Sequence, residues 1–446
     1  GGVWIGSHPD PAEDTPGLEL VAEEPYRRLA FRLSEEEEEN YYLGYANSVL
    51  WPLCHRRVDL VDLQPAYEES YRSVNARVAA LIAEVAGPED LIWIHDYHFF
   101  PLASELRKLG MENRIGFFLH IPFPSLGDLS VLSQPKDFAD WLSHYNLLGL
   151  QTSGDVARCL EMYRADPRAE FMTDGTVKFH DRITSVRSFP IGINVCEFQE
   201  QAEKAEENPF GREAPETFVI GVDRLDYSKG IPNRFLAFGR YLETRPEGSR
   251  PCLVQIAPPT RERVQAYQVI TRELEEIGGH LNGAYAELDW TPIRYIHRSV
   301  SRARLARLFR LARVCMVTSF ADGMNLVAKE YVAAQDPEDP GVLILSRFAG
   351  AAEDMTEALL VNPYDVEDMA AAIHTALVMP LEERLARHAH SMEVVNRTDV
   401  VSWTTNIIRA LNAAPPTLVP PWARGDAEVR DAPVATFHRT NRDPVQ

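Results

Sequence analysis

Short apolar runs alternate with amphipathic helical patterns along both halves of the chain, and this alternation limits the possible fold more than any other feature. Apolar runs occupy residues 91–94, 115–119 and 147–150 in the first half, and 218–222 and 314–317 in the second. Strands of a parallel sheet are buried on both faces, so they read as continuous apolar runs. We therefore predict that each half is an α/β domain, a doubly wound parallel sheet.

Length and charge limit the classes of protein further. The chain has 446 residues, too many for one core of ordinary size, so two domains are expected. Its 45 basic and 66 acidic residues give a formal charge of −21, which argues against binding to nucleic acid or to an anionic membrane. The sequence lacks an apolar run of about 18 residues and a basic-then-apolar N-terminus, so we expect neither a membrane span nor a secretory signal.

The five cysteines are scattered, odd in number and without the spacing of a zinc site. They are expected to be buried free thiols in a reducing compartment, which makes the cytoplasm the expected location. They are Cys54, Cys159, Cys196, Cys252 and Cys315.

Composition suggests where the domains meet. We predict an N-terminal domain over residues 1–192, a C-terminal domain over 193–395, and a closing helix with a flexible tail over 396–446. Residues 4–24 are rich in Pro and acidic residues and are predicted to be loop, and the Glu-rich residues 197–215 are predicted to be a linker. Ser34 and Glu37 form a capping-box pattern that predicts a helix start.

The stretch at residues 319–331 joins an apolar run to a helix through a polar turn at Asp322 and Gly323. Such a strand–turn–helix unit directs free backbone N–H groups and the positive end of a helix toward a ligand above the sheet, which suits a phosphate. Glu330 follows in the helix and could meet a second part of the same ligand. Taken alone, the stretch fits an ordinary solvated helix equally well.

Polar residues stand where the predicted strands end. His95, Asp96 and His98 follow one strand of the first half, and His120 follows the next. Open parallel sheets bind ligands at the carboxyl ends of their strands, so we favour a functional role for the three histidines as a set. Residues 40–55 are rich in aromatic and amide groups and suit a sugar-binding wall, although core packing is preferred for Tyr45 and Leu50.

In the second half, Arg224 and Lys229 flank a predicted strand-to-helix turn, and Arg261 follows the next strand. Cations at such a turn in an acidic protein can clamp a diphosphate, with surface ion pairing as the alternative. The sequence has no phosphate loop of the Gly-x-x-x-x-Gly-Lys-Ser/Thr type, no Gly-x-Gly-x-x-Gly after a first strand, no Gly-x-Ser-x-Gly and no Asp-x-Asp. We therefore expect two domains facing each other across a cleft, with cations in place of a metal to stabilise a leaving diphosphate.

Six segments together carry a family resemblance that runs from Trp4 to about Leu411. They are Y-Y-L-G-Y-A-N-S-V-L-W-P, L-I-W-I-H-D-Y-H, R-I-G-F-F-L-H-I-P-F-P, V-D-R-L-D-Y-S-K-G, D-G-M-N-L-V-A-K-E-Y-V-A-A-Q and V-L-I-L-S-R-F-A-G-A-A. The chain resembles the alpha,alpha-trehalose-6-phosphate synthases. The resemblance implies two Rossmann-like domains in the GT-B arrangement.

The implied reaction is transfer of glucose, with retention, from a nucleotide diphosphate glucose to glucose 6-phosphate, giving trehalose 6-phosphate. UDP-glucose is the expected donor, although the sequence leaves UDP, GDP and ADP open. The resemblance implies no cofactor, no metal, and no nucleic-acid or membrane partner; a homo-oligomer stays open. The family's front-face mechanism, in which the leaving phosphate helps deprotonate the acceptor hydroxyl, needs no enzymatic nucleophile.

The resemblance also assigns residues. The catalytic set is Arg224, Lys229, Asp96 and His120. In the donor set, Arg224 and Lys229 bind the diphosphate, Asp322 binds the sugar and Glu330 binds the ribose. The other members of the donor set are His120, Val300, Gly323, Met324, Asn325, Leu326, Val327, Ala328 and Lys329. The acceptor set is Tyr42, Trp51, Asp96 and Arg261, with Arg261 on the phosphate, and Trp51 and Ile121 lie where the family selects the anomer.

Three departures accompany the resemblance. The family begins with a strand and a Gly-Gly-Leu loop, and this chain is expected to lack them because it starts after that point. It has Ala321 where the family usually has Arg, and Ser125-Leu126-Gly127-Asp128 where the family usually has Ser/Thr-Pro-Glu. The alternatives are a glucosylglycerol-phosphate synthase, a pseudo-glycosyltransferase and a non-catalytic sugar-phosphate sensor; Tyr42, Trp51 and Arg261 favour a phosphosugar acceptor.

Overall fold

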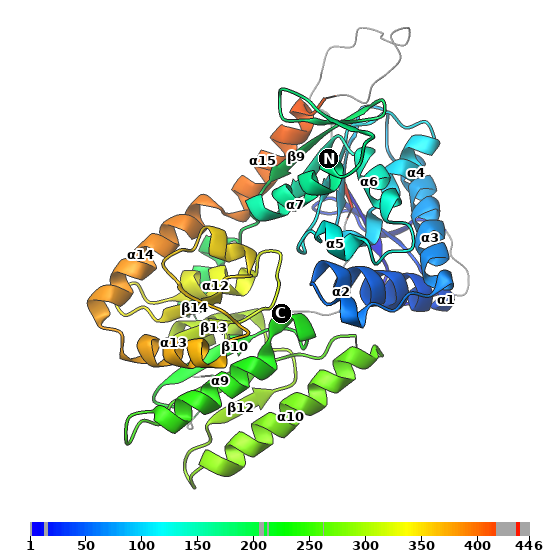
Figure 1. The fold of residues 1–446 in the computed structure, drawn as a ribbon. Coiled ribbons are helices and arrows are strands. Elements are labelled where there is room, and N and C mark those ends of the chain that lie inside the picture. The colour runs from blue at the N-terminus through cyan, green and yellow to red at the C-terminus, as the bar shows by residue number, and fades with distance from the viewer. Residues whose placement is uncertain are drawn as a thin grey trace. The chain divides into compact units, whose positions relative to one another are not determined.

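The structure, a computed structural model, describes residues 2–12, 17–204, 209–211, 214–261, 263–415 and 434–437, the last four as backbone. Contacts divide it into two units: the described residues up to Phe189 with those from Thr404 on, and Pro190–Trp403. The boundaries predicted from the sequence were 192 and 395. Figure 1 shows the elements of each unit.

The first unit contains both helices and strands. Its strands are β1 (Val3–Ser7), β2 (Glu19–Ala22), β3 (Arg27–Phe31), β4 (Leu91–His95), β5 (Ile115–Phe118), β6 (Leu147–Leu150), β7 (Ala169–Phe171), β8 (Val177–Phe179), β9 (Arg182–Ser188) and β16 (Val434–Phe437). Its helices are α1 (Glu35–Glu37), η1 (Glu38–Leu50, π-helical), α2 (Trp51–Cys54), η2 (Val58–Leu60), α3 (Pro65–Ala83), η3 (Tyr97–Phe99), α4 (Leu102–Lys108), α5 (Leu126–Leu129), α6 (Pro135–Ser143) and α7 (Ser153–Arg164).

The sheet of this unit has the strand order β2-β3-β1-β16-β4-β5-β6-β9-β8-β7. In this spatial order, every neighbouring pair from β3 across to β9 is parallel. The outer pairs β2–β3, β7–β8 and β8–β9 are antiparallel. Strand β16 lies in the interior of the sheet, between β1 and β4. The predicted flexible tail therefore contains a strand; its other residues from 416 on lie outside the described part of the chain.

The second unit holds the remaining elements. Its strands are β10 (Phe218–Val222), β11 (Cys252–Ile256), β12 (Ile293–Ile296), β13 (Val314–Val317), β14 (Val342–Ser346) and β15 (Leu359–Val361). Its helices are α8 (Val195–Lys204), η4 (Tyr227–Lys229), α9 (Ile231–Thr244), α10 (Gln265–Tyr285), α11 (Arg302–Leu311), α12 (Leu326–Ala334), η5 (Gly350–Glu353), α13 (Val366–Val378) and α14 (Leu381–Arg397), and α15 (Val400–Ala413) passes from this unit into the first.

Its sheet is parallel throughout, in the order β12-β11-β10-β13-β14-β15. Counted from β10, this is the 3-2-1-4-5-6 order of a Rossmann sheet, which confirms the predicted doubly wound α/β fold. Helix α12 lies on one side of these strands and α9 and α13 on the other (Figure 1).

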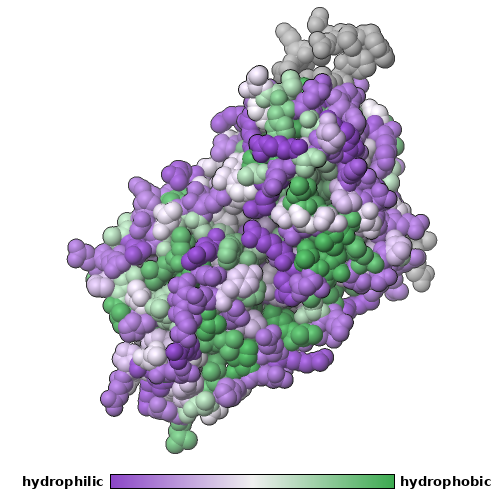
Figure 2. Space-filling view, viewed as in Figure 1, coloured by the Kyte–Doolittle hydropathy of each residue, from purple (hydrophilic) through white to green (hydrophobic). Residues whose placement is uncertain are grey.

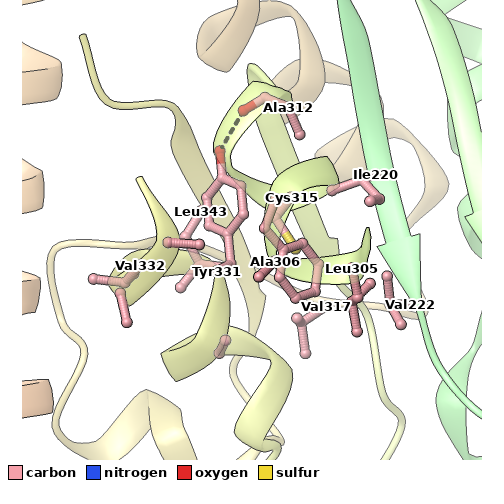
Figure 3. Packing of buried hydrophobic residues seen from close by; sticks show 14 of the residues in the cluster. Ile220, Val222, Leu305, Ala306, Ala312, Cys315, Val317, Tyr331, Val332 and Leu343 are labelled. Atoms are coloured by element: carbon pink, nitrogen blue, oxygen red, sulfur yellow. Dashed lines mark hydrogen bonds between the residues drawn. The ribbon is translucent and has the colours of Figure 1, made fainter. Parts of the chain in front are cut away.

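The core of the second unit contains side chains from both the sheet and its covering helices. Figure 3 shows Tyr331 of α12 packed among Cys315, Leu343 and Ala306, with its hydroxyl donating to Ala312 O at 3.1 Å. Burial raises the pKa of Tyr331 well above its usual range, so this hydroxyl stays a donor. The helix that follows the 319–325 stretch is thus fixed on the sheet by its buried face.

Three predictions from composition were wrong. Residues 4–24, predicted to be loop, contribute most of β1 and all of β2, because pairing with neighbouring strands of the sheet decides their conformation. Residues 197–215, predicted to be linker, begin within α8, whose Val195, Phe198 and Ala202 fill the core. Cys196 is exposed, whereas the other four cysteines are buried as predicted.

The surface face drawn in Figure 2 is covered mostly by hydrophilic residues, with hydrophobic residues in separate, smaller patches. Within the described ranges, no helix combines the length and apolar character needed to cross a membrane.

Candidate functional site

The strand order of the second unit identifies where a ligand would bind. Strands β10 and β13 are neighbours, and the chain runs from β10 to β11 on one side and from β13 to β14 on the other. Ligands of such sheets bind outside the carboxyl ends of the two strands where the order reverses. Arg224 and Lys229 follow β10, and Asp322 follows β13, so the predicted residues stand at this position.

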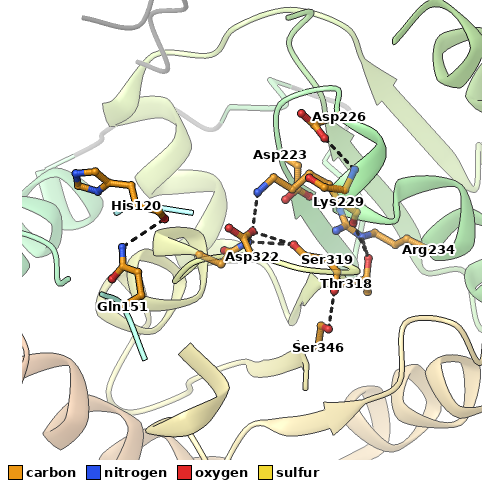
Figure 4. A network of polar contacts seen from close by, with 12 residues as sticks. His120, Gln151, Asp223, Asp226, Lys229, Arg234, Thr318, Ser319, Asp322 and Ser346 are labelled. Atoms are coloured by element: carbon orange, nitrogen blue, oxygen red, sulfur yellow. Dashed lines mark hydrogen bonds and ion pairs between the residues drawn. The ribbon is translucent and has the colours of Figure 1, made fainter. Parts of the chain in front are cut away.

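Asp322 is the centre of a polar cluster at this switch point (Figure 4). Its Oδ2 accepts from Lys229 Nζ at 2.6 Å, from Ser319 Oγ at 3.0 Å and from Asn325 Nδ2 at 3.0 Å. Side-chain exposure is only 11% for Lys229 and 13% for Asp322. Because three donors converge on one oxygen, the carboxylate is held in a single orientation.

The turn that carries Lys229 is fixed on both sides. Asp226 Oδ1 accepts from the backbone N–H of Ser228 at 2.8 Å and so caps the short helix η4. Gly230 ends the turn with φ of +63°, and a Cβ there would lie 2.3 Å from the carbonyl oxygen of Thr318. Glycine is therefore needed at this position, where the β10 and β13 loops touch.

A buried arginine lies beneath both loops. Arg234 of α9 is 0% exposed, and its Nη1 lies 2.8 Å from Asp223 Oδ2 and donates to Gln255 Oε1 at 2.7 Å. Its Nε donates to Thr318 Oγ1 at 3.0 Å. Burial raises the pKa of Asp223, an effect that Arg234 opposes. The network ties the ends of β10 and β13 to β11, so removal of one partner would leave a buried charge uncompensated.

Glu330 and Lys329 are neighbours in α12 but lie in different surroundings. Glu330 is half-buried, and burial raises the pKa of its carboxyl to about 7. Lys329 is 0% exposed; its Nζ donates to Ile191 O at 2.7 Å and to Thr398 Oγ1 at 3.2 Å, and burial lowers its pKa to about 8. The Lys329 ammonium is thus engaged by protein oxygens.

The other predicted donor residues divide by burial. Met324 and Ala328 belong to the hydrophobic core, while Leu326, Val327 and Val300 are half-buried and pack against it. The Met324 and Ala328 side chains therefore serve packing. Residues 323 and 325 lie in the turn before α12, and Arg224 is half-buried in the loop after β10.

Arg261 follows β11, and its side chain is 5% exposed. Its Nη1 donates to Tyr267 Oη at 2.7 Å and lies 3.3 Å from Asp226 Oδ2. Residues Asp226 and Tyr267 were not among the predicted site residues.

In the first unit, the predicted residues at the ends of β4 and β5 meet. His120 donates its backbone N–H to Asp96 Oδ1 at 3.2 Å, and its Nε2 lies 3.0 Å from His95 Nδ1. The two imidazoles stack with ring centroids 5.3 Å apart. Gln151, at the end of β6, donates to His120 O at 3.4 Å (Figure 4). Polar groups from three successive strands thus gather at one edge of this sheet.

The predicted acceptor and anomer residues of this unit are buried or half-buried. Trp51 is 3% exposed and stacks on His55 at 4.1 Å, and Ile121 is 7% exposed. Tyr42, which is half-buried, stacks on His98 at 5.8 Å. Tyr45 and Leu50 are buried, which confirms the preference for core packing.

Left-handed backbone conformations coincide with the predicted site. Five described non-glycine residues have positive φ, and three of them are Asp96 (73°), Arg261 (48°) and Asn325 (71°). Such conformations are costly and collect where the surroundings impose them, often at functional sites. The other two, Arg56 and His180, lie outside the predicted site, so positive φ supports these three positions without being specific to them.

Sequence reasoning missed several residues that hold this arrangement, namely Ser319, Asp226, Tyr267, Arg234 and Gln151. Asp226 could have been found from the sequence, because an Asp whose side chain accepts from the backbone N–H two residues later is typical of a turn. Ser319 acts on Asp322 only three residues later. Arg234, Tyr267 and Gln151 act over long sequence separations that a periodic pattern does not reveal. Among the described residues, no group of three or more His, Cys, Asp or Glu side chains could hold a metal ion.

Known proteins resemble this chain in sequence and in fold. A trehalose-6-phosphate synthase of Cronobacter sakazakii is 42% identical over 425 residues, covering 93% of this chain and 89% of that protein. An alpha,alpha-trehalose-phosphate synthase (UDP-forming) from Burkholderia xenovorans, solved in complex with glucose 6-phosphate, is 41% identical with a TM-score of 0.89, covering 92% of this chain and 93% of that one. A trehalose-6-phosphate structure from E. coli bound with UDP-2-fluoro glucose is 41% identical with a TM-score of 0.90, covering 93% and 94%.

These likenesses extend over nearly the whole chain, and the fold class is that of the GT-B enzymes. The sequence model of glycosyltransferase family 20 matches residues 2–413. The chain belongs to glycosyltransferase family 20.

Proposed function

We propose that the protein is an alpha,alpha-trehalose-6-phosphate synthase, which transfers glucose from UDP-glucose to glucose 6-phosphate and releases UDP. The proposal rests on one observation: Lys229 and Asp322 form an ion pair at the point where the strand order of a Rossmann sheet reverses. The relatives described above support the same reaction, since one was solved with glucose 6-phosphate and another with a fluorinated UDP-glucose.

On the donor side, Arg224 and Lys229 are proposed to bind the diphosphate, and Asp322 the hydroxyls of the glucose. Glu330 is proposed to accept hydrogen bonds from the ribose, and the backbone of the turn before α12 to contact the sugar and phosphates. Support comes from the fixed orientation of Asp322 and from the position of both turns at strand ends. The Lys229 ammonium next to Asp322 would contact both the diphosphate and the sugar-binding carboxylate.

On the acceptor side, Arg261 is proposed to bind the phosphate of glucose 6-phosphate. Asp96, Tyr42 and Trp51 are proposed to bind its sugar, with Trp51 and Ile121 selecting the anomer. His120 is proposed to contact the donor glucose. The support is the gathering of Asp96 and His120 at one sheet edge and the left-handed backbone at Asp96 and Arg261.

The proposed chemistry is a front-face substitution at the anomeric carbon of the donor. The bond from that carbon to the diphosphate oxygen breaks, and the bond to the acceptor hydroxyl oxygen forms on the same face. The acceptor proton passes to the departing diphosphate, whose charge Arg224 and Lys229 stabilise. Neither an enzymatic nucleophile nor a cofactor takes part in this scheme.

Two departures from the family pattern bear on the acceptor. Ser125 and Asp128 form a complete capping box for α5, so the unusual segment has its own helix start. Ala321 is 2% exposed and lies directly before Asp322. The alternatives named from the sequence were a glucosylglycerol-phosphate synthase, a pseudo-glycosyltransferase and a non-catalytic sensor; the relatives described above support the trehalose-6-phosphate synthase instead. We also propose a cytoplasmic location, since the chain has four buried free thiols.

The test measures nucleotide diphosphate release from UDP-, GDP- and ADP-glucose with glucose 6-phosphate, glycerol 3-phosphate or no acceptor. The proposal predicts release from UDP-glucose that depends on glucose 6-phosphate. Release that depends on glycerol 3-phosphate would identify the related synthase. No release from any donor, with glucose 6-phosphate bound in calorimetry, would identify the sensor.

A further inference from the structure

Two buried side chains outside the predicted ligand set hold the guanidinium of Arg261. The Arg261 side chain is 5% exposed, and its Nη1 donates to Tyr267 Oη at 2.7 Å. The same nitrogen lies 3.3 Å from Asp226 Oδ2. An arginine side chain is long and has several rotatable bonds, so two contacts at its end restrict where the charge lies.

Tyr267 forms a bridge between the arginine and the aspartate. Its hydroxyl accepts from Arg261 and donates to Asp226 Oδ2 at 2.8 Å. Tyr267 is 2% exposed and Asp226 0%. Burial raises the pKa of Tyr267 well above its usual range, so the phenol keeps the proton that it donates. The three groups form a closed triangle of hydrogen bonds.

Asp226 also belongs to the turn that carries Lys229. While its Oδ2 faces Tyr267 and Arg261, its Oδ1 accepts from Ser228 N at 2.8 Å (Figure 4). One carboxylate thus joins the loop after β10 to the loop after β11. The first loop carries the proposed diphosphate-binding lysine, and the second carries the proposed phosphate-binding arginine.

We propose that Tyr267 and Asp226 are positioning residues that fix Arg261 for the phosphate of the acceptor sugar. This rests on the proposed function, in which Arg261 binds that phosphate. A guanidinium held in one orientation binds phosphate with less loss of conformational freedom than a mobile one. The Tyr267 hydroxyl therefore affects binding of glucose 6-phosphate and leaves binding of UDP-glucose unchanged.

The test compares Tyr267→Phe with wild type by steady-state kinetics and by calorimetric titration with glucose 6-phosphate. Tyr267→Phe is expected to raise the KM and the Kd for glucose 6-phosphate roughly tenfold, with the KM for UDP-glucose unchanged. Asp226→Asn, which places an amide N–H against Tyr267 and Arg261, is expected to raise the same constants. Tyr241→Phe is the matched control, because Tyr241 is also 2% exposed and its ring packs on Phe238 and His374.

A double-mutant cycle separates positioning from general damage to the fold. In an Arg261→Ala background, Tyr267→Phe is expected to have no further effect on the Kd for glucose 6-phosphate. An unchanged Kd in Tyr267→Phe, equal effects on both substrates, or additivity with Arg261→Ala would overturn the proposal. Wild type that binds glucose 6-phosphate but releases no UDP would refute the proposed reaction instead, and the titrations would still test the positioning.

Discussion

Lys229 Nζ lies 2.6 Å from Asp322 Oδ2, and the two residues come from turns that follow adjacent parallel strands. In sequence they are 93 residues apart. The pair places a cation and a carboxylate together where the sheet order reverses, and Ser319 and Asn325 fix the carboxylate.

Asp322→Asn should therefore remove the charge while keeping the size of the side chain. We expect kcat to fall by about 100-fold, the loss typical when a charge-stabilising group of an active site is removed. Asp289→Asn, an exposed partner of Arg250, is the control and should retain wild-type kcat. Both variants are measured by UDP release; an Asp322→Asn variant with wild-type kcat would show that this carboxylate is not part of the site.

Arg224→Ala tests the diphosphate clamp. We expect kcat to fall roughly 100-fold or more, because charge on the leaving diphosphate develops in the transition state. The KM for glucose 6-phosphate should change far less, since Arg224 is proposed to contact only the donor. The control Arg250→Ala removes an exposed arginine paired with Glu287 and Asp289. Unchanged turnover in Arg224→Ala would refute the clamp.

Glu330 predicts a pH dependence of donor binding. Burial raises the pKa of its carboxyl to about 7, so the carboxylate that would accept from the ribose is lost as pH falls through 7. We expect the KM for UDP-glucose to rise below that pH in wild type. In Glu330→Gln this dependence should be weaker, whereas Glu382→Gln, an exposed control, should behave like wild type. Parallel pH profiles for all three proteins would contradict the assignment.

The Glu330 carboxyl should also make the stability of the fold depend on pH. Whereas donor binding is expected to improve as pH rises, stability is expected to fall. Its pKa rises from 4.5 to about 7 on folding, so the unfolded chain releases the proton first as pH increases. The contribution of the protonated Glu330 carboxyl to the free energy of unfolding is therefore lost as pH rises from 4.5 to about 7. Glu330→Gln should gain stability relative to wild type over this range in urea denaturation. A constant difference between the two proteins would show that folding does not shift this pKa.

Lys329 provides a test at higher pH. Burial lowers its pKa from 10.5 to about 8, so the unfolded chain binds the proton first as pH falls. Its contribution to the free energy of unfolding should rise between pH 8 and 10.5. Lys329→Met should remove this rise in urea denaturation, whereas Lys108→Met, whose side chain is 69% exposed in wild type, should keep it. Equal slopes in all three proteins would contradict the burial of the ammonium.

The sequence predicted those parts of the fold that local patterns determine. The strand at Phe218–Val222 has the bounds of the apolar run from which it was predicted, because a continuous apolar run marks a strand buried on both faces. Most of the strand at Val3–Ser7 falls within residues 4–24, which were predicted to be loop, since only pairing with β3 and β16 makes this segment a strand. The π-helical form of Glu38–Leu50 likewise had no signal in the periodicity.

The candidate site likewise contains residues that a local pattern predicts and residues that only the fold brings together. Arg224, Lys229 and Asp322 could be chosen because these charged residues stand in the polar turns that follow apolar runs. The Tyr267 bridge could not, because it depends on Asp226 lying 41 residues earlier in the sequence. The side chain of Lys329 looked available for a ligand, and only the fold shows that Ile191 and Thr398 engage it.

The most direct test of the proposed reaction is the structure of its product. Wild-type protein is incubated with UDP-glucose and glucose 6-phosphate, and the sugar product is examined by proton and phosphorus NMR. We predict one UDP for each disaccharide phosphate formed, with both anomeric protons showing the small coupling of an α linkage. A β-linked product, or no disaccharide phosphate while the substrates remain intact, would contradict it.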